Sequence, residues 1–269
     1  MTRRERGFAL LVVLWTLGLL ALLGTQFVAA GRADMSLAGN LRAAAMVEAA
    51  TSGAIQQAVF QLLQQGPGGW RANGGPYEVR IGGTQVTIGI ADEGDRLNPN
   101  LADQSVLTAL LGQVGADPNT AAAVAAAILD WRTGGDLARP GGAKAPQYSA
   151  AGRAYGPPNA PFRGVDELGL VLGMTPALLE RLRPHLTVFT DFAPLGDSSD
   201  PIVAAALRVT APAGAPPAGG DLGDIAVARI TATGRGPDDA AVTLRAIVRL
   251  NATPDGLPFE ILFWQTVDG

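Results

Sequence analysis

An uncharged apolar run near the N-terminus constrains the fold of this 269-residue chain more than any other feature. From Phe8 to Ala30 no residue is charged, and three arginines precede the run. An α-helix rises ~1.5 Å per residue, so a helix of this length matches the ~30 Å hydrocarbon core of a bilayer. Arginines on the short N-terminal side favour a cytoplasmic N-terminus. Residues 8–30 are therefore predicted to form one transmembrane helix.

Three kinds of segment share this pattern. A secretory signal peptide would be cleaved after small residues such as Val28-Ala29-Ala30. A plain membrane anchor would keep the run intact. A prepilin-type leader would be cut between Gly7 and Phe8, so that Phe8 becomes the new N-terminus.

The helical pattern does not stop at Ala30. Apolar residues continue at spacings of mostly three and four as far as Leu63, and no proline interrupts them. The first break is Gly66-Pro67-Gly68-Gly69. We therefore predict one helix over residues 8–65, half in the bilayer and half packed on a soluble domain. A signal-peptide cut at Ala30 would divide this helix.

The composition excludes several classes of function. The formal net charge is −4 and the basic residues are scattered, which is a poor electrostatic match for nucleic acid. There is no cysteine, so thiol nucleophiles, disulfides and Cys-based metal sites are excluded. His185 is the only histidine and follows Pro184, where a packing or surface role is the simpler interpretation. The sequence has no Gly-x-Ser-x-Gly elbow, so we expect no enzyme activity.

Beyond the long helix, strand patterns flank a helical region. Strands are expected at 77–81, 85–90, 225–233, 241–250 and 259–266. Gly82-Gly83-Thr84 joins the first two and suits positive φ. Helices are expected at 106–111, 121–131, 165–172, 175–186 and, shorter, at 203–208. A Gly- and Pro-rich loop covers 132–163. This order predicts an α+β fold in which a helical insertion interrupts a sheet.

Four blocks of sequence, taken together and in order, are distinctive. Phe8–Trp15 follows the basic leader. The others are Asp92–Asn100, which ends in Asn-x-Asn; Ile128–Arg132 with Pro140–Ala143 and Tyr148; and Pro158–Phe162 with Val165–Leu168 and Val171–Thr175. These blocks cover most of the chain and resemble those of the type II secretion minor pseudopilin K family, also called general secretion pathway protein K.

The resemblance implies a pilin-like α+β fold. A long N-terminal helix would pack on an antiparallel sheet, and a large all-α domain of helix-hairpin-helix or SAM-like type would be inserted into it. The implied parts are a prepilin leader at 1–7, the helix at 8–65 with its membrane span at 8–30, a sheet domain from 76–97 and 189–269, and the inserted domain at 98–188.

The resemblance also implies a function without bond chemistry. A prepilin peptidase would cleave after Gly7 and methylate the amine of Phe8. The protein would then help to initiate the pseudopilus at its tip, with minor pseudopilins I and J, and so support protein export across the outer membrane. Secreted cargo or the secretin would be further partners, and nucleic acid would not. The expected location is the inner membrane, with the C-terminal domain in the periplasm.

Val12 bears on the position in the filament. It is the fifth residue after the expected cut, where most pilin-like subunits carry glutamate. A lone glutamate in hydrocarbon would cost several kcal/mol. A subunit with nothing stacked above it meets no neighbouring amine, so an apolar residue fits a tip position.

Calcium is a further implication of the resemblance, in the helical insertion near the Asp-Trp pair. The candidate ligands are Asp130 and Asp136. Departures from the acidic residues expected in relatives occur at Thr133, Gly134, Lys144, Pro146 and Gln147. Because Ca²⁺ takes six to eight oxygen ligands, two aspartates form a thin site. This small number of ligands favours the competing interpretation, in which Asp130 caps a helix or forms hydrogen bonds in a loop.

Two alternatives stay open. The chain could instead be a membrane-anchored periplasmic binding protein, or a DNA-uptake pilin that uses the helix–Gly–helix segment around Gly173, although that turn has no basic residue. Trp131, Tyr148 and Phe162 form either a surface for cargo or the secretin, or the core of the insertion, because a small helical domain needs its aromatic residues inside.

Overall fold

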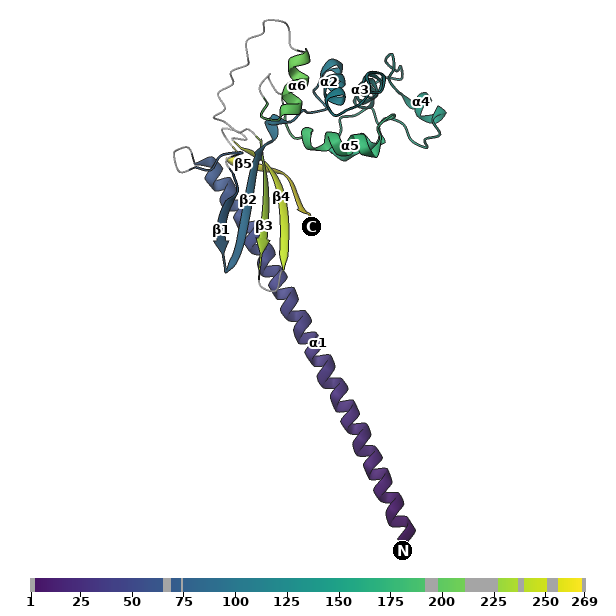
Figure 1. Cartoon of the computed structure of the whole chain (residues 1–269), viewed down its shortest axis with the longest axis vertical. Coiled ribbons are helices and arrows are strands. Elements are labelled where there is room, and N and C mark those ends of the chain that lie inside the picture. Colours follow the sequence, from purple (N-terminus) through teal and green to yellow (C-terminus); the bar gives the residue numbers. More distant parts are fainter. Residues whose placement is uncertain are drawn as a thin grey trace.

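One very long helix carries a sheet near its C-terminal end, and shorter helices gather beyond that sheet (Figure 1). Helix α1 spans Arg3–Leu63. In Figure 1 its N-terminal part extends away from the rest of the chain. The computed structural model describes residues 3–64, 69–73, 75–191, 198–210, 227–236, 240–250 and 256–267.

The prediction of one continuous helix is confirmed, with a start at Arg3 and an end at Leu63 in place of residues 8 and 65. The glycine-rich break expected at 66–69 lies mostly outside the described residues. Among the helices that the structure describes, none combines the length and the apolar character that a membrane crossing requires. The span at 8–30 stays a prediction.

The sheet has five antiparallel strands in the order β1-β2-β3-β4-β5. Neighbours in the sheet are therefore also neighbours in the sequence. The predicted hairpin is confirmed, with a two-residue turn in which Gly82 has φ 56° and Gly83 φ 89°, while Thr84 already pairs with Ile81. The strands are β1 Tyr77–Ile81, β2 Thr84–Asp92, β3 Val227–Arg235, β4 Ala241–Leu250 and β5 Phe259–Val267.

The C-terminal part of α1 packs against one face of this sheet. Its buried residues contact alternate residues of the three central strands, as expected for a sheet with one covered face. The helix approaches β3 closely, and a side chain on Gly234 would overlap the Oγ1 atom of Thr51. Ala50, Ala54, Ile55, Ala58 and Val59 of α1 meet Val86, Ile88, Ile90, Ala228, Ile230, Ala232, Leu244, Ala246 and Val248.

The short helices that the structure describes lie between β2 and β3 in the sequence, although these two strands pair directly. The chain leaves the sheet after Asp92 and passes through a second hydrophobic core before it returns. The helices are α2 Gln104–Gln113, α3 Pro118–Arg132, α4 Ala145–Ala150, α5 Pro176–Leu182 and α6 Pro201–Thr210, with the 3-10 turns η1 Glu93–Asp95, η2 Val165–Leu170 and η3 Arg183–His185.

Three expectations for this region need correction. The loop expected at 132–163 contains α4, because Pro146 lies in the first turn, where proline is tolerated. The helix expected at 165–172 is the 3-10 helix η2. Finally, α6 packs on α2 and shares the helical core through Val203 and Ala206, so the helical region does not end at residue 188.

Candidate functional site

The N-terminal part of α1 exposes apolar side chains on all sides. Phe8 is 74% exposed and Val12 46%, and Gly7 lies in the same helix, so the expected processing site is on α1. No other part of the chain that the structure describes covers these side chains. The exposed set between residues 8 and 26 is Phe8, Leu10, Leu11, Val12, Val13, Leu14, Trp15, Leu17, Leu19, Leu20, Leu22 and Leu23.

The two candidate metal ligands have different environments. Asp130 is fully buried near the end of α3, and its carboxylate accepts from the backbone N of Arg139 at 3.0 Å and from Nη1 of Arg139 at 2.8 Å. Asp136 is exposed in the following loop. Within the described residues, no group of three or more acidic or histidine side chains is placed to hold a metal ion. The Asp130 carboxylate is hydrogen-bonded to the following loop at Arg139. Calcium at Asp130 and Asp136 stays a prediction.

The three aromatic residues of the insertion are in its core. Trp131 and Phe162 are each 3% exposed and stack with ring centroids 5.8 Å apart, and Tyr148 is fully buried beside them. The Tyr148 hydroxyl accepts from the backbone N of Leu172, and burial raises the pKa of Tyr148. These rings therefore hold the helices together and form no docking surface.

The Asn-x-Asn motif connects distant loops. Asn98 is buried and its side-chain amide donates to the carbonyl of Thr190 at 2.6 Å. Asn100 exchanges two hydrogen bonds with the backbone of Phe162, at 2.8 and 2.9 Å. Arg132 donates to the carbonyls of Pro99 and Ala102. The two asparagines supply hydrogen-bond partners to buried backbone groups. This structural role explains the motif without a catalytic or ligand-binding one.

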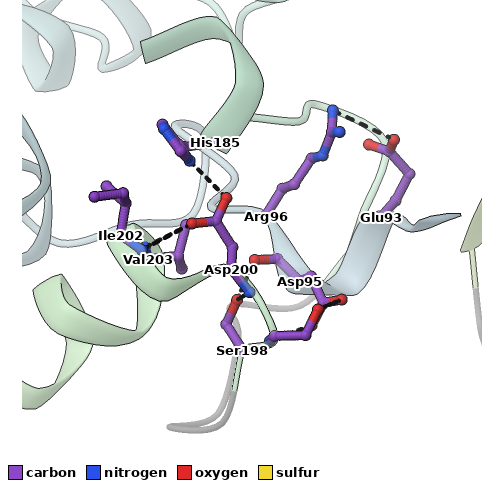
Figure 2. Close-up of polar contacts among 9 residues, drawn as sticks. Glu93, Asp95, Arg96, His185, Ser198, Asp200, Ile202 and Val203 are labelled. Carbon is purple, nitrogen blue, oxygen red and sulfur yellow. Dashed lines mark hydrogen bonds and ion pairs between the residues drawn. The ribbon is translucent and has the colours of Figure 1, made fainter. Parts of the chain in front are cut away.

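His185 joins two elements where the helical region meets the sheet. Figure 2 shows its ring pointing to Asp200, with Nδ1 2.5 Å from Oδ2. The other carboxylate oxygen of Asp200 accepts from the backbone N of Ile202 and Val203, at the start of α6. A packing or surface role was predicted for His185, and no sequence signal indicated its partner Asp200, which lies 15 residues away.

A buried ion pair lies at the same junction. Glu93 is fully buried, with Oε1 2.6 Å from Nε of Arg229 on β3 and 3.8 Å from Nη1 of Arg96 (Figure 2 shows the second contact). Burial lowers the pKa of Arg229 to about 10, and the Glu93 charge acts in the opposite direction. This pair was not predicted from the sequence, because an acidic stretch between a strand and a turn resembles a solvated loop.

Comparisons with known proteins agree with this architecture. A family model described as type II secretion system (T2SS), protein K, matches residues 88–191. The match begins in β2 and covers the helices α2 to α5. It therefore includes the Asn-x-Asn motif, Asp130 and the aromatic core described above.

Two individual proteins are similar to the chain over a longer part of its sequence than the family model covers. The type II secretion system protein K of Klebsiella pneumoniae is 28% identical over 211 residues, which are 71% of this chain. The chain covers 65% of the length of that relative. A chain in the crystal structure of the GspK–GspI–GspJ complex from the enterotoxigenic Escherichia coli type 2 secretion system has a similar fold, with a TM-score of 0.60 and 16% identity, covering 88% of this chain and 99% of that one. Taken together, these three likenesses support the interpretation of this chain as a type II secretion minor pseudopilin K.

Proposed function

We propose that this chain is the tip subunit of a type II secretion pseudopilus, where it helps to initiate assembly and so supports protein export across the outer membrane. The observation that carries this proposal is the division of α1. Its C-terminal part packs on the sheet, while its N-terminal part exposes a continuous apolar surface. Such a surface needs a bilayer or the apolar helices of other subunits.

The placement at a tip rests on the shape of the molecule. The helical region lies beyond the end of the sheet that is farthest from the N-terminus (Figure 1). We propose that it is the inserted helix-hairpin-helix or SAM-like domain of this family. Subunits of a filament stack through their N-terminal helices, so bulk at the far end of the sheet would obstruct a subunit stacked above. A tip position avoids that obstruction.

The partners follow from the same proposal. The solved complex that this chain resembles contains GspK, GspI and GspJ. We propose that minor pseudopilins I and J bind this chain, and that secreted cargo or the secretin are further partners. The work of the protein would be assembly through helix packing, with no catalysed reaction and no nucleic acid.

The proposed location before assembly is the inner membrane, crossed once, with the C-terminal region in the periplasm. The uncharged run from Phe8 to Ala30 supports the crossing, and the three arginines before it support the orientation. Val12 lies in this run, and its apolar side chain is consistent with a subunit that has no neighbour above it.

Processing at Gly7 and Phe8 provides a direct test. The full chain is produced with and without an active prepilin peptidase, and its N-terminal peptide is analysed by mass spectrometry. We expect a chain that begins at N-methylated Phe8 only when the peptidase is active. A chain that keeps Met1 beside an active peptidase, while a known pseudopilin in the same cells is cut, would contradict the pilin pathway.

A further inference from the structure

The chain contains a single lysine, and that lysine is buried. Lys144 is 2% exposed. All other residues among the 20 lysines and arginines of the chain are arginine. Lysine is almost never fully buried unless its charge is paired, because removing an ammonium group from water costs several kcal/mol. The surroundings of Lys144 must therefore compensate for that cost.

Three oxygens surround the Lys144 ammonium group. Nζ donates to the carbonyl oxygen of Asp130 at 2.6 Å, to the carbonyl oxygen of Thr133, and to Oδ1 of Asn159 at 2.6 Å. An ammonium group has three N–H donors, so each donor has a partner. Two of the oxygens lie at the C-terminal end of α3, where the helix dipole favours a cation. We refer to these three oxygens as the ammonium cage.

The nearby carboxylate takes no part in the cage. The Asp130 side chain is bound to the backbone and guanidinium of Arg139, and the Cα of Gly142 lies so close that any side chain there would overlap Oδ2 of Asp130. Asp136 is exposed elsewhere in the loop. A Ca²⁺ ion would need six to eight oxygens, several of them carboxylates. These residues do not fit calcium.

We propose that the Lys144 ammonium group is a built-in cation that holds the loop between α3 and α4 together, so that this region folds without calcium. The ammonium group joins the end of α3 to Asn159, while the Lys144 backbone N donates to Gln147 Oε1 at 2.9 Å and starts α4. One side chain thus connects three segments that a metal ion could otherwise connect. This inference does not depend on the proposed place in the pseudopilus.

The first test uses the unaltered full chain in detergent. Its Tm is measured with a chelator and with millimolar calcium, and the protein is labelled with ¹⁵N-lysine, which gives one side-chain signal. We expect calcium to change the Tm by less than about 1 °C, well below the effect of a structural metal site, and to leave the signal unmoved. A calcium-dependent rise of several degrees, or a shift of that signal, would overturn the proposal.

The second test removes the charge. Lys144→Met leaves three oxygens without donors, so we expect its Tm to fall by about 5 °C or more. Arg153→Met is the matched control, because it removes an exposed cation close to α4 and should change the Tm little. Lys144→Arg keeps the charge but not the compact shape and should not restore stability. Equal stability of Lys144→Met and Arg153→Met would contradict the cage.

A third measurement covers the case in which Lys144→Met does not fold. The folded natural chain is treated with an amine-acetylating reagent, and the peptide containing Lys144 is followed by mass spectrometry. We expect Lys144 to stay unmodified until the chain is denatured. Acetylation of the folded chain at the rate of a free lysine side chain would show that the ammonium group is not enclosed.

Discussion

At the end of β2, effects of opposite sign act on the pKa of a single residue, Asp92. Asp92 is the last residue of β2, and its carboxylate accepts from the backbone N of Gly94 at 2.7 Å. Burial raises the pKa of Asp92, and the neighbouring charges of Asp95 and Glu93 add to that rise, while the bond from Gly94 opposes it. The folded chain therefore holds this proton more tightly than the unfolded chain does.

The direction of the shift fixes the pH dependence. A raised pKa gives stability that is present at low pH and lost as the pH rises through the folded-state pKa. Asp92→Asn keeps the acceptor for Gly94 but carries no charge, so we expect its Tm at pH 7 to exceed that of the natural chain by a few degrees. The difference should shrink as the pH falls towards 4, and differential scanning calorimetry of the full chain in detergent measures both values.

Asp117 provides the control with the opposite sign. Its pKa is lowered by hydrogen bonds to Thr120, with the bond from the backbone N of Asn119 acting in the same direction, and it caps α3. Asp117→Asn should therefore give no gain at pH 7, since asparagine caps a helix about as well as aspartate. If Asp92→Asn instead lowered the Tm at pH 7, the ionised Asp92 would be stabilising and the argument from burial would be wrong.

At the scale of elements, the fit of α1 on the sheet depends on a missing side chain. A Cβ atom on Gly234 would overlap Oγ1 of Thr51 and lie 3.2 Å from Val47 Cγ1. Thr51 is fully buried, and its hydroxyl donates to the Val47 carbonyl at 2.7 Å. The helix can therefore approach β3 this closely only because position 234 is glycine.

Gly234→Ala tests this fit. We expect it to destabilise the chain by about 1–3 kcal/mol, the usual cost of overpacking, measured by thermal or chemical unfolding. Gly89→Ala is the matched control, because its Cβ would meet nothing closer than the Thr231 carbonyl at 4.0 Å. The double variant Gly234→Ala with Thr51→Ala should recover most of the loss. Equal effects of Gly234→Ala and Gly89→Ala would show that the helix does not depend on this contact.

Elements with a local signal could be predicted from the sequence. The uncharged run and its periodic continuation gave α1, and Gly82-Gly83 gave the hairpin turn, because both signals come from residues that are neighbours in the chain. Helix α4 was missed because Pro146 indicates a loop unless its place in the first turn is known. Its start depends on Lys144 and Gln147, which carry no periodic signal.

The polar sites could be predicted less well. Glu93 and Arg229 belong to opposite ends of the helical region in the sequence, yet β2 and β3 bring them together. No pattern along the chain shows that pairing. The ammonium cage has the same origin, because Asp130 and Asn159 meet only through Lys144. The one local signal was that this lysine is unique in the chain.

At the scale of the whole molecule, the described residues form two hydrophobic cores, and the long helix α1 packs into one of them. The sheet core includes the C-terminal part of α1, whereas the helical core is built without it. At the exit from β2, Glu93 pairs with Arg229 of β3. Backbone hydrogen bonds then join Leu97 to His185 and Thr187 within the helical region. Among the described residues, the N-terminal part of α1 contributes to neither core.

Copurification tests whether the N-terminal part of α1 binds partner subunits. The tagged full chain is extracted from membranes in mild detergent, together with minor pseudopilins I and J. In the same experiment, Val12→Glu should retain less of both partners than Val12→Leu, because an unpaired carboxylate in an apolar helix interface is costly. Equal retention by the two variants would contradict the role proposed for Val12, but not the proposed binding of I and J.

The retention of I and J by the natural chain is the most direct test of the central claim. The account predicts that both minor pseudopilins elute with the tagged chain, and that deletion of residues 8–26, the exposed apolar part of α1, reduces their recovery several-fold. If neither pseudopilin is retained by the natural chain, while I and J still bind each other in the same detergent, the chain is not the tip subunit proposed here.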